Sequence, residues 1–367
     1  MAQGRWSDSD QHYLRLACRL ARKAAGRTSP NPIVGAVLVR NGKMVGTGYH
    51  RIAGGDHAEI IALKQAGAKA KGATLYITLE PCSHHGRTPP CVESLIRAGI
   101  KEVVAGMTDP NPLVAGQGFT RLRRAGIQVR VGLCETECRL LVEAFTKFIT
   151  QRLPFVTLKL ATTLDGKIAT VKRDSHWISG PQSRSLVHRW RNEMDAVLVG
   201  AGTVRADDPQ LTCRMAGGRN PYRIVLDGRL RIPLSSQLFH QPDPEKTIVA
   251  TTLKAPIKKL SAIEALGAQV WRLPARENQL AWKPLLQKLA ARGIVSLLIE
   301  GGAAVAASAL SERIVDKIQL FYAPKIVGGD GRVMIDALGI KKMAQAIELN
   351  QLAVRKSGDD LWVSGYL

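Results

Sequence analysis

Hydrophobic and polar residues follow two periods along the first part of the chain. Residues 8–25 repeat apolar positions at helical spacing, and Gly26 is placed to end that helix. Asn41-Gly42 lies between two short apolar runs and favours a hairpin, since a type I′ turn needs positive φ at both central residues. Downstream the pattern predicts helices at 57–65, 117–125 and 135–148 and strands at 33–39, 44–49, 74–79, 101–107 and 127–131.

The pattern restarts after residues 151–154 and then alternates between strand and helix. At 367 residues the chain is too long for one ordinary core, so we expect two domains, over 1–150 and 151–367. Both are predicted to be α/β. In the second half the predicted strands are 155–160, 196–200, 223–226, 247–250, 269–273, 295–299 and 317–322, and the predicted helices are 182–192, 282–291 and 303–310.

Three potential zinc ligands occur in the first half: His57, Cys82 and Cys91. Three protein ligands leave the fourth zinc position to water, so this number favours a catalytic site over a structural one. Glu59 is placed to move protons, as in the His-x-Glu and Pro-Cys signature of zinc nucleobase deaminases. Residues i and i+2 of a helix point apart, so His57 and Glu59 can share a site only at the irregular start of a helix.

The spacing of the cysteines departs from that signature, because eight residues instead of two separate Cys82 from Cys91. Zinc fixes ligand geometry and not loop length, so a longer loop can still return Cys91 to the metal at the start of a helix. His84, His85 and Arg87 add polar groups beside the expected reaction centre. The alternative is a surface histidine with two buried structural cysteines, but the combined motif favours catalytic zinc.

Charge and composition narrow the function classes. Lys and Arg outnumber Asp and Glu by 52 to 30, and the net charge of +22 favours polyanionic partners. The basic residues are scattered, however, and phosphorylated small molecules would suit them as well as nucleic acid.

No apolar run reaches the roughly 18 residues that span a bilayer. The start of the chain lacks a secretion signal and the six cysteines are sparse, so we expect a cytoplasmic protein with reduced thiols.

Three segments of the second half combine glycines with predicted strand ends: 158–167, 200–214 and 299–303. Glycines between a strand and a helix let backbone N–H groups approach a phosphate. The Gly-x-Gly-x-x-Gly fingerprint does not occur, so a Rossmann site is not indicated. On spacing alone, turns and helix caps explain each segment equally well.

Five motifs follow one another along the chain: His57-Ala-Glu59, Glu80-Pro-Cys-Ser-His-His-Gly-Arg-Thr-Pro-Pro-Cys91, Leu164-Asp-Gly-Lys167, Gly202-Thr-Val-Arg-Ala-Asp-Asp-Pro209 and Glu300-Gly-Gly302. In this order they resemble the bifunctional deaminase/reductase family of bacterial riboflavin biosynthesis, essentially from end to end. The resemblance implies a cytidine-deaminase-like α/β/α domain followed by a dihydrofolate-reductase-like α/β domain. It also accounts for the unusual cysteine spacing.

The resemblance implies two consecutive reactions. The first domain would deaminate 2,5-diamino-6-ribosylamino-4(3H)-pyrimidinone 5′-phosphate. Zinc on His57, Cys82 and Cys91 would lower the pKa of its water to about 7, and Glu59 would carry the proton to the departing amine. The second domain would use NADPH to reduce the ribosyl group of 5-amino-6-(5-phosphoribosylamino)uracil to a ribityl group.

The resemblance also implies where the ligands of the reductase lie. Two arginines, Arg191 and Arg214, suit a phosphate because a guanidinium offers a bidentate charged fork, and neither has a carboxylate partner in the adjacent sequence. The alternative for Arg191 is an ordinary solvated helix position. The implied NADPH contacts are Ala161, Trp177, Thr203, Asp207 and Gly302. The implied substrate contacts are Ser175, Arg191, Leu211, Arg214 and Glu300.

Two other hypotheses stay open. The zinc motif and the basic charge also suit a nucleic-acid deaminase, such as a tRNA adenosine deaminase, with an RNA-binding second half, although nothing there resembles a known RNA module. The other is a non-catalytic protein with structural zinc, against which Glu59 and the three-ligand set argue. The expected partners are phosphorylated pyrimidines, with no nucleic acid and no membrane, and a homo-oligomer is expected.

Overall fold

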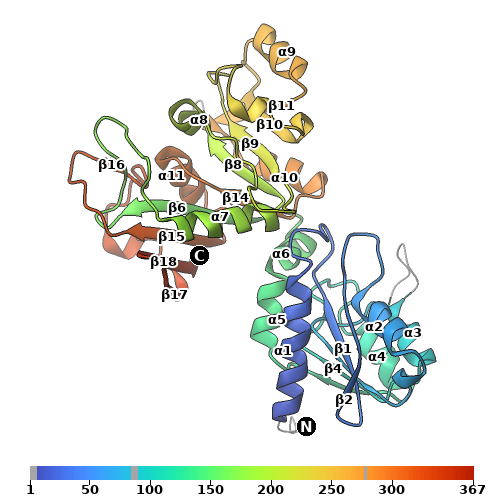
Figure 1. Cartoon of the computed structure of the whole chain (residues 1–367). Helices are drawn as coiled ribbons and strands as arrows, with labels where there is room; N and C mark the ends of the chain where they lie inside the picture. Colours follow the sequence, from blue (N-terminus) through green and yellow to red (C-terminus); the bar gives the residue numbers. More distant parts are fainter. Residues whose placement is uncertain (1–5, 84–89, 277–278) are drawn as a thin grey trace. The chain divides into compact units, whose positions relative to one another are not determined.

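The computed structural model describes residues 6–83, 90–276 and 279–367. The chain divides into unit 1, Met1–Arg152, and unit 2, Leu153–Leu367 (Figure 1). Each unit has its own sheet and its own buried clusters of apolar side chains.

Unit 1 is built on a mixed sheet. Its described strands lie in the order β2-β1-β3-β4-β5, with β1 antiparallel to β2 and β3, and with β3, β4 and β5 parallel. Asn41 and Gly42 have φ of 50° and 71°, as the hairpin prediction requires. The strands are β1 (Gly35–Arg40), β2 (Lys43–Tyr49), β3 (Thr74–Ile77), β4 (Glu102–Ala105) and β5 (Gln128–Val131).

Helices cover both faces of the unit 1 sheet (Figure 1). Alternate residues of a strand point to opposite faces, so Val37 packs with α1 and α5 while Leu38 packs with α2, α3 and α4. The single helix predicted over 135–148 is wrong, because Val142, with φ of −119°, separates α5 from α6. The helices are α1 (Asp8–Arg22), α2 (Ala58–Ala66), the 3₁₀ turn η1 (Gly67–Ala70), α3 (Cys91–Arg97), α4 (Gln117–Arg124), α5 (Glu135–Leu141) and α6 (Glu143–Gln151).

Unit 2 is built on a longer sheet in the order β11-β10-β9-β8-β14-β6-β15-β18-β17. The strands from β11 to β15 run parallel, and β18 and β17 close the sheet as an antiparallel hairpin. The hairpin was not predicted from the sequence, because β17 is exposed almost throughout and its apolar residues are confined to Leu352, Ala353 and Val354. The strands are β6 (Phe155–Thr163), β8 (Ala196–Gly200), β9 (Tyr222–Leu226), β10 (Thr247–Thr252), β11 (Gln269–Leu273), β14 (Ser296–Ile299), β15 (Lys317–Ala323), β17 (Asn350–Ser357) and β18 (Asp360–Tyr366).

Helices also cover both faces of the unit 2 sheet. One buried cluster contains side chains of α10 and α11, and the other contains side chains of α8 and α9 with Trp190 of α7 packed against it. The sequence missed α8, a short helix that contains Gly202, and α9. The helices are α7 (Pro181–Glu193), α8 (Ala201–Asp207), α9 (Ile257–Ala265), α10 (Trp282–Ala291), α11 (Ala303–Ser311) and the 3₁₀ turns η2 (Gln237–Phe239), η3 (Pro244–Lys246) and η4 (Met343–Gln345). Two small ribbons pair β7 (Lys167–Ala169) with β16 (Arg332–Val333) and β12 (Ala275–Arg276) with β13 (Gln279–Leu280).

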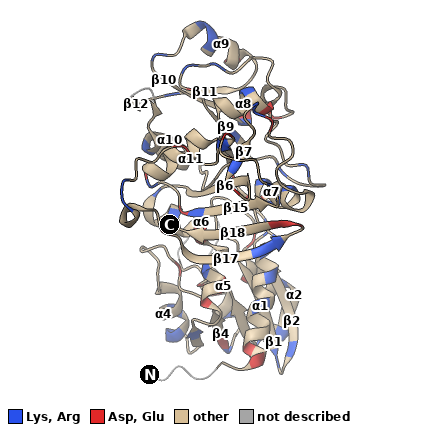
Figure 2. Cartoon of the chain, turned by 90° about the vertical axis from the view of Figure 1, so that its left-hand side faces the viewer, with Lys and Arg blue, Asp and Glu red and all other residues tan. Residues whose placement is uncertain are grey.

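The charged residues are scattered in the fold, as they are along the sequence (Figure 2). In the view of Figure 2, lysine and arginine residues are distributed over elements of both units. Among the residues that the structure describes, no helix is both long and apolar enough to cross a membrane.

Candidate active site

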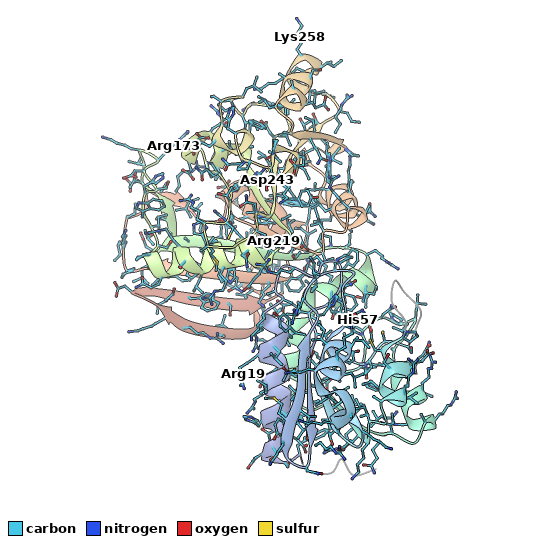
Figure 3. The ribbon with its side chains drawn as sticks, turned by 45° about the vertical axis from the view of Figure 1, so that its right-hand side comes forward. Arg19, His57, Arg173, Arg219, Asp243 and Lys258 are labelled. Atoms are coloured by element: carbon cyan, nitrogen blue, oxygen red, sulfur yellow. The ribbon has the colours of Figure 1, made fainter. Side chains whose placement is uncertain are left out.

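The three candidate zinc ligands come together in unit 1. His57 is the N-cap residue of α2, Cys91 is the first residue of α3, and Cys82 lies in the segment that follows β3. Their ligand atoms all lie within 4.8 Å of one another. The position of His57 in unit 1 is labelled in Figure 3. The partial positive charge at the N-terminus of α3 would favour a thiolate at Cys91 once a metal ion displaces its proton.

The geometry of this cluster fits zinc. Nδ1 of His57 lies 3.1 Å from Sγ of Cys91 and 3.5 Å from Sγ of Cys82. Tetrahedral zinc, with bonds of about 2.1 Å to nitrogen and 2.3 Å to sulfur, needs N···S separations of about 3.5 Å. The backbone N–H of Cys91 also donates to Sγ of Cys82 at 3.3 Å, which orients that sulfur.

Hydrogen bonds within the cluster set its protonation. Bonds from Cys91 and His57, against the opposing effect of burial, lower the pKa of Cys82 to about 4. The same bond to Cys82, together with burial, raises the pKa of Cys91, and the bond to Cys82 raises the pKa of His57. The Cys82 thiolate is thus available to a metal ion, and binding would displace the proton that its neighbours hold.

A cavity of about 420 Å³ opens beside the cluster and is lined by His57, Cys82 and Glu59 among other residues. Glu59 follows His57 in the first turn of α2 and is only 3% exposed. Burial raises the pKa of Glu59. A raised carboxyl pKa brings proton uptake and release closer to neutral pH, as a general acid–base group requires.

Further polar residues line this cavity, and no role was predicted for them from the sequence: Asn31, His50, Glu80, Asp109 and Asn111. Nδ1 of His50 lies 3.1 Å from the carbonyl oxygen of Asp56, and Nε2 lies 3.4 Å from the side-chain nitrogen of Asn31. Since a carbonyl only accepts, Nδ1 carries the proton and Nε2 accepts from Asn31. The turn-rich segment after the predicted strand 101–107 was the available signal for Asp109 and Asn111.

One expectation from the sequence falls on undescribed residues. His84, His85 and Arg87 lie within 84–89, outside the described residues.

In unit 2, Arg191 of α7 pairs with Glu300, which follows β14. The two hydrogen bonds measure 2.5 Å from Nε and 2.8 Å from Nη2, and the side chains are 12% and 7% exposed. Arg191 also donates to the carbonyl oxygen of Thr212, the residue after Leu211. The solvated alternative for Arg191 is therefore wrong, and its carboxylate partner lies 109 positions away in the sequence.

Lys159 of β6 belongs to the same charged group, although no role was predicted for it from the sequence. Burial lowers its pKa, partly offset by the charge of Glu300. Its position as the one charged residue of a largely buried strand was the signal that could have found it.

The other predicted reductase residues form separate pairs. The N–H of Gly302 donates to Oγ1 of Thr203 at 3.3 Å, and Oγ of Ser175 donates to Asp207 at 3.3 Å. The side chain of Arg214 is exposed.

Two of the predicted NADPH contacts lie apart from these pairs. Ala161 pairs with Phe321 across β6 and β15. Trp177 is 60% exposed, and the guanidinium of Arg184 lies 4.6 Å from its ring centroid.

The strand order explains why these segments meet. β8, β14 and β6 are neighbouring parallel strands, so their carboxyl ends bring residues 161–163, 200–203 and 299–302 to one edge of the sheet, where open α/β folds bind ligands. Gly301 has φ of 95°, and a Cβ at Gly302 would lie 3.3 Å from Oγ1 of Thr203. Both positions therefore favour glycine, and the backbone between β14 and α11 carries no side chain at residues 301 and 302.

Comparisons with known proteins cover both units. The family "Cytidine and deoxycytidylate deaminase zinc-binding region" matches residues 7–107, and "RibD C-terminal domain" matches residues 154–363. The chain is 47% identical over 353 residues to the riboflavin biosynthesis protein RibD of Aquifex aeolicus, covering 96% of this chain and 97% of the relative. It is 45% identical over 360 residues to RibD of Synechocystis, covering 98% and 96%.

Solved structures agree with these matches. RibD of Acinetobacter baumannii superposes with a TM-score of 0.87 at 37% identity, covering 98% of each chain. A Thermotoga maritima structure described as a diaminohydroxyphosphoribosylaminopyrimidine deaminase/5-amino-6-(5-phosphoribosylamino)uracil reductase gives a TM-score of 0.85 at 38% identity, covering 98% of each chain. These findings confirm the expected family and fold class, and they do not favour the tRNA deaminase. The chain belongs to the RibD family, the bifunctional enzymes of riboflavin biosynthesis that combine a zinc-dependent deaminase with an NADPH-dependent reductase.

Proposed function

We propose that residues 1–150 deaminate 2,5-diamino-6-ribosylamino-4(3H)-pyrimidinone 5′-phosphate and that residues 151–367 reduce the ribosyl group of the product. The observation that carries the first assignment is the three-ligand cluster beside a cavity that Glu59 also lines. The substrates correspond to the activities in the description of the Thermotoga maritima structure.

In the deaminase we assign His57, Cys82 and Cys91 to the metal and Glu59 to proton transfer. When bound, zinc activates water for attack on the carbon that carries the 2-amino group. Glu59 accepts a proton from that water and returns it to the amine, which must be protonated to leave as ammonia. The raised pKa of Glu59 supports the second half of this cycle.

In the reductase we assign Ala161, Trp177, Thr203, Asp207 and Gly302 to NADPH, which supplies a hydride when bound. The position of Thr203 and Gly302 at the carboxyl ends of β8 and β14 supports this assignment.

For the substrate of the reductase we assign Ser175, Arg191, Leu211, Arg214 and Glu300. Because Arg191 is already paired with Glu300, Arg214 is the better candidate for the phosphate. The Arg191–Glu300 pair would then hold a fixed charged surface toward the sugar or base.

The remaining proposals concern partners and location. Phosphorylated small molecules account for the basic charge without nucleic acid or a membrane. We also propose a cytoplasmic enzyme, because its six cysteines are sparse, and a homo-oligomer.

Incubation of the purified protein with the diamino pyrimidine phosphate tests the function. Ammonia should be released without NADPH, and oxidation of NADPH should begin only once the deaminated product has formed. NADPH oxidation without prior ammonia release would contradict the proposed order of the two reactions.

A further inference from the structure

Glu80 is a buried carboxylate that the mechanism above does not use. It is 5% exposed and lies two residues before Cys82. Among the described residues, four backbone N–H groups donate to it. Asp109 and Gly116 donate to Oε2 at 3.0 and 2.9 Å, and Gly118 and Phe119 donate to Oε1 at 2.8 and 3.3 Å.

These contacts occupy the carboxylate fully. A carboxylate has about four acceptor sites on its two oxygens, and each oxygen of Glu80 already accepts two N–H groups. Glu80 therefore has little capacity left to bind the substrate or to carry a proton, although it lines the cavity. Its position indicates a role exerted through the residues that it holds.

Glu80 supplies a cap that α4 lacks. The N-cap residue of α4 is Gly116, which has no side chain to accept the first N–H groups of the helix. Gly118 permits the close approach, because a Cβ there would lie 2.2 Å from the carbonyl oxygen of Pro81. The segment that leads to Cys82 and the start of α4 are thus joined through one side chain.

Residues 109–111, which Glu80 holds through the N–H of Asp109, form one wall of the deaminase cavity. The N–H of Asp109 is fixed by Glu80, Oδ1 of Asp109 accepts the N–H of Asn111 at 2.8 Å, and Oδ1 of Asn111 accepts the N–H of Leu113 at 3.1 Å. Asp109 and Asn111 both line the cavity. The orientation of these two side chains therefore depends on Glu80.

We propose that Glu80 is a positioning residue of the deaminase, which holds Asp109 and Asn111 against the polar edge of the pyrimidine. This inference rests on the proposed deaminase function. Glu80 thereby affects substrate binding indirectly, by orienting Asp109 and Asn111, and takes no part in zinc binding or proton transfer.

The test is Glu80→Gln, which keeps the shape of the side chain but points an NH₂ group at two N–H donors. We expect zinc content to be retained, kcat of deamination to change by less than about threefold and KM to rise by about tenfold or more. Amide hydrogen exchange should become faster at the two N–H groups that face the new NH₂ group. These are Asp109 and Gly116 if NH₂ replaces Oε2, and Gly118 and Phe119 if it replaces Oε1. Glu102→Gln is the matched control, because Glu102 pairs with Arg130 and is not among the residues that line the cavity.

A double-mutant cycle separates action through the wall from a direct effect. If Glu80 acts through Asn111, the free-energy changes that correspond to the rises in KM for Glu80→Gln and Asn111→Ala should sum to more than the change in the double variant. Should Glu80→Gln fail to fold, Glu80→Asp replaces it, since the shorter side chain cannot reach both pairs of N–H groups and predicts the same rise in KM.

An unchanged KM, additive effects, or loss of zinc from the folded variant would each overturn the proposal. A wild-type protein that releases no ammonia contradicts the deaminase function instead, and hydrogen exchange still tests whether Glu80 holds the wall.

Discussion

The buried Arg191–Glu300 pair should contribute strongly to the stability of unit 2. Removing one partner of a buried ion pair typically costs about 3–5 kcal/mol, because the remaining charge stays buried. In Arg191→Ala the charge of Lys159 would still offset part of that of Glu300. Arg191 and Glu300 are 12% and 7% exposed, so Arg191→Ala should approach that range. For a unit of this size about 1 kcal/mol lowers Tm by roughly 2–4 °C, which predicts a fall of roughly 6–20 °C.

The pH dependence of stability provides a second measure of the same pair. Burial acts to raise the pKa of Glu300, but the opposing charge and hydrogen bonds of Arg191 hold it below its ordinary value. A depressed folded-state pKa stabilises the protein above the unfolded value of about 4.3, and this stability is lost as pH falls through the lower folded value. Arg191→Ala should therefore weaken the acid dependence of unfolding.

Thermal unfolding of unit 2, followed by calorimetry with and without NADPH, is the assay. The control removes all three charges, as Arg191→Met with Glu300→Leu and Lys159→Met, because Lys159 interacts with Glu300 as well. It should destabilise unit 2 less than Arg191→Ala alone. A loss below about 1 kcal/mol in Arg191→Ala, or a charge-free variant that is less stable than Arg191→Ala, would refute the assignment of a compensated buried pair.

Three further predictions follow from the sites. Cys91→Ser should lower zinc below the one ion per chain expected of the wild type, while Cys213→Ser should not; unchanged zinc in Cys91→Ser would exclude ligation across the long loop. Residues 153–367 expressed alone should fold and bind NADPH, since they have their own core, and a folded unit without affinity for NADPH would count against the assigned cofactor residues. Arg214→Ala should raise KM for the phosphorylated reductase substrate by roughly tenfold to a hundredfold and leave KM for NADPH unchanged; equal discrimination against the dephosphorylated compound by variant and wild type would exclude Arg214 from the phosphate site.

Local patterns predicted most of the fold that surrounds the site. The Asn41-Gly42 turn and the helix starts at His57 and Cys91 depend on neighbouring residues, and so could be read from the sequence. The break at Val142 was missed because the apolar period continues across it from α5 to α6.

Long-range contacts could not be predicted in the same way. Glu300 meets Arg191 across 109 positions and Gly118 meets Glu80 across 38, so neither contact leaves a local pattern. The family resemblance implied both Arg191 and Glu300 as substrate residues, but it did not imply that they pair with each other. Only the fold showed that Glu80, which lies in the Glu80–Cys91 motif, accepts hydrogen bonds from the segment that contains Asp109.

The most direct measurement of the central claim is deamination by Glu59→Gln, with zinc content and reductase activity measured on the same sample. Gln preserves the shape of Glu59 but cannot exchange a proton, and general acid–base catalysis contributes about 10²–10⁴-fold. Ammonia release should fall by at least about a hundredfold, while zinc content and reduction of the pre-deaminated substrate stay at the wild-type level. Ammonia release at the wild-type rate would contradict the claim that Glu59 carries the proton in a zinc-dependent deaminase.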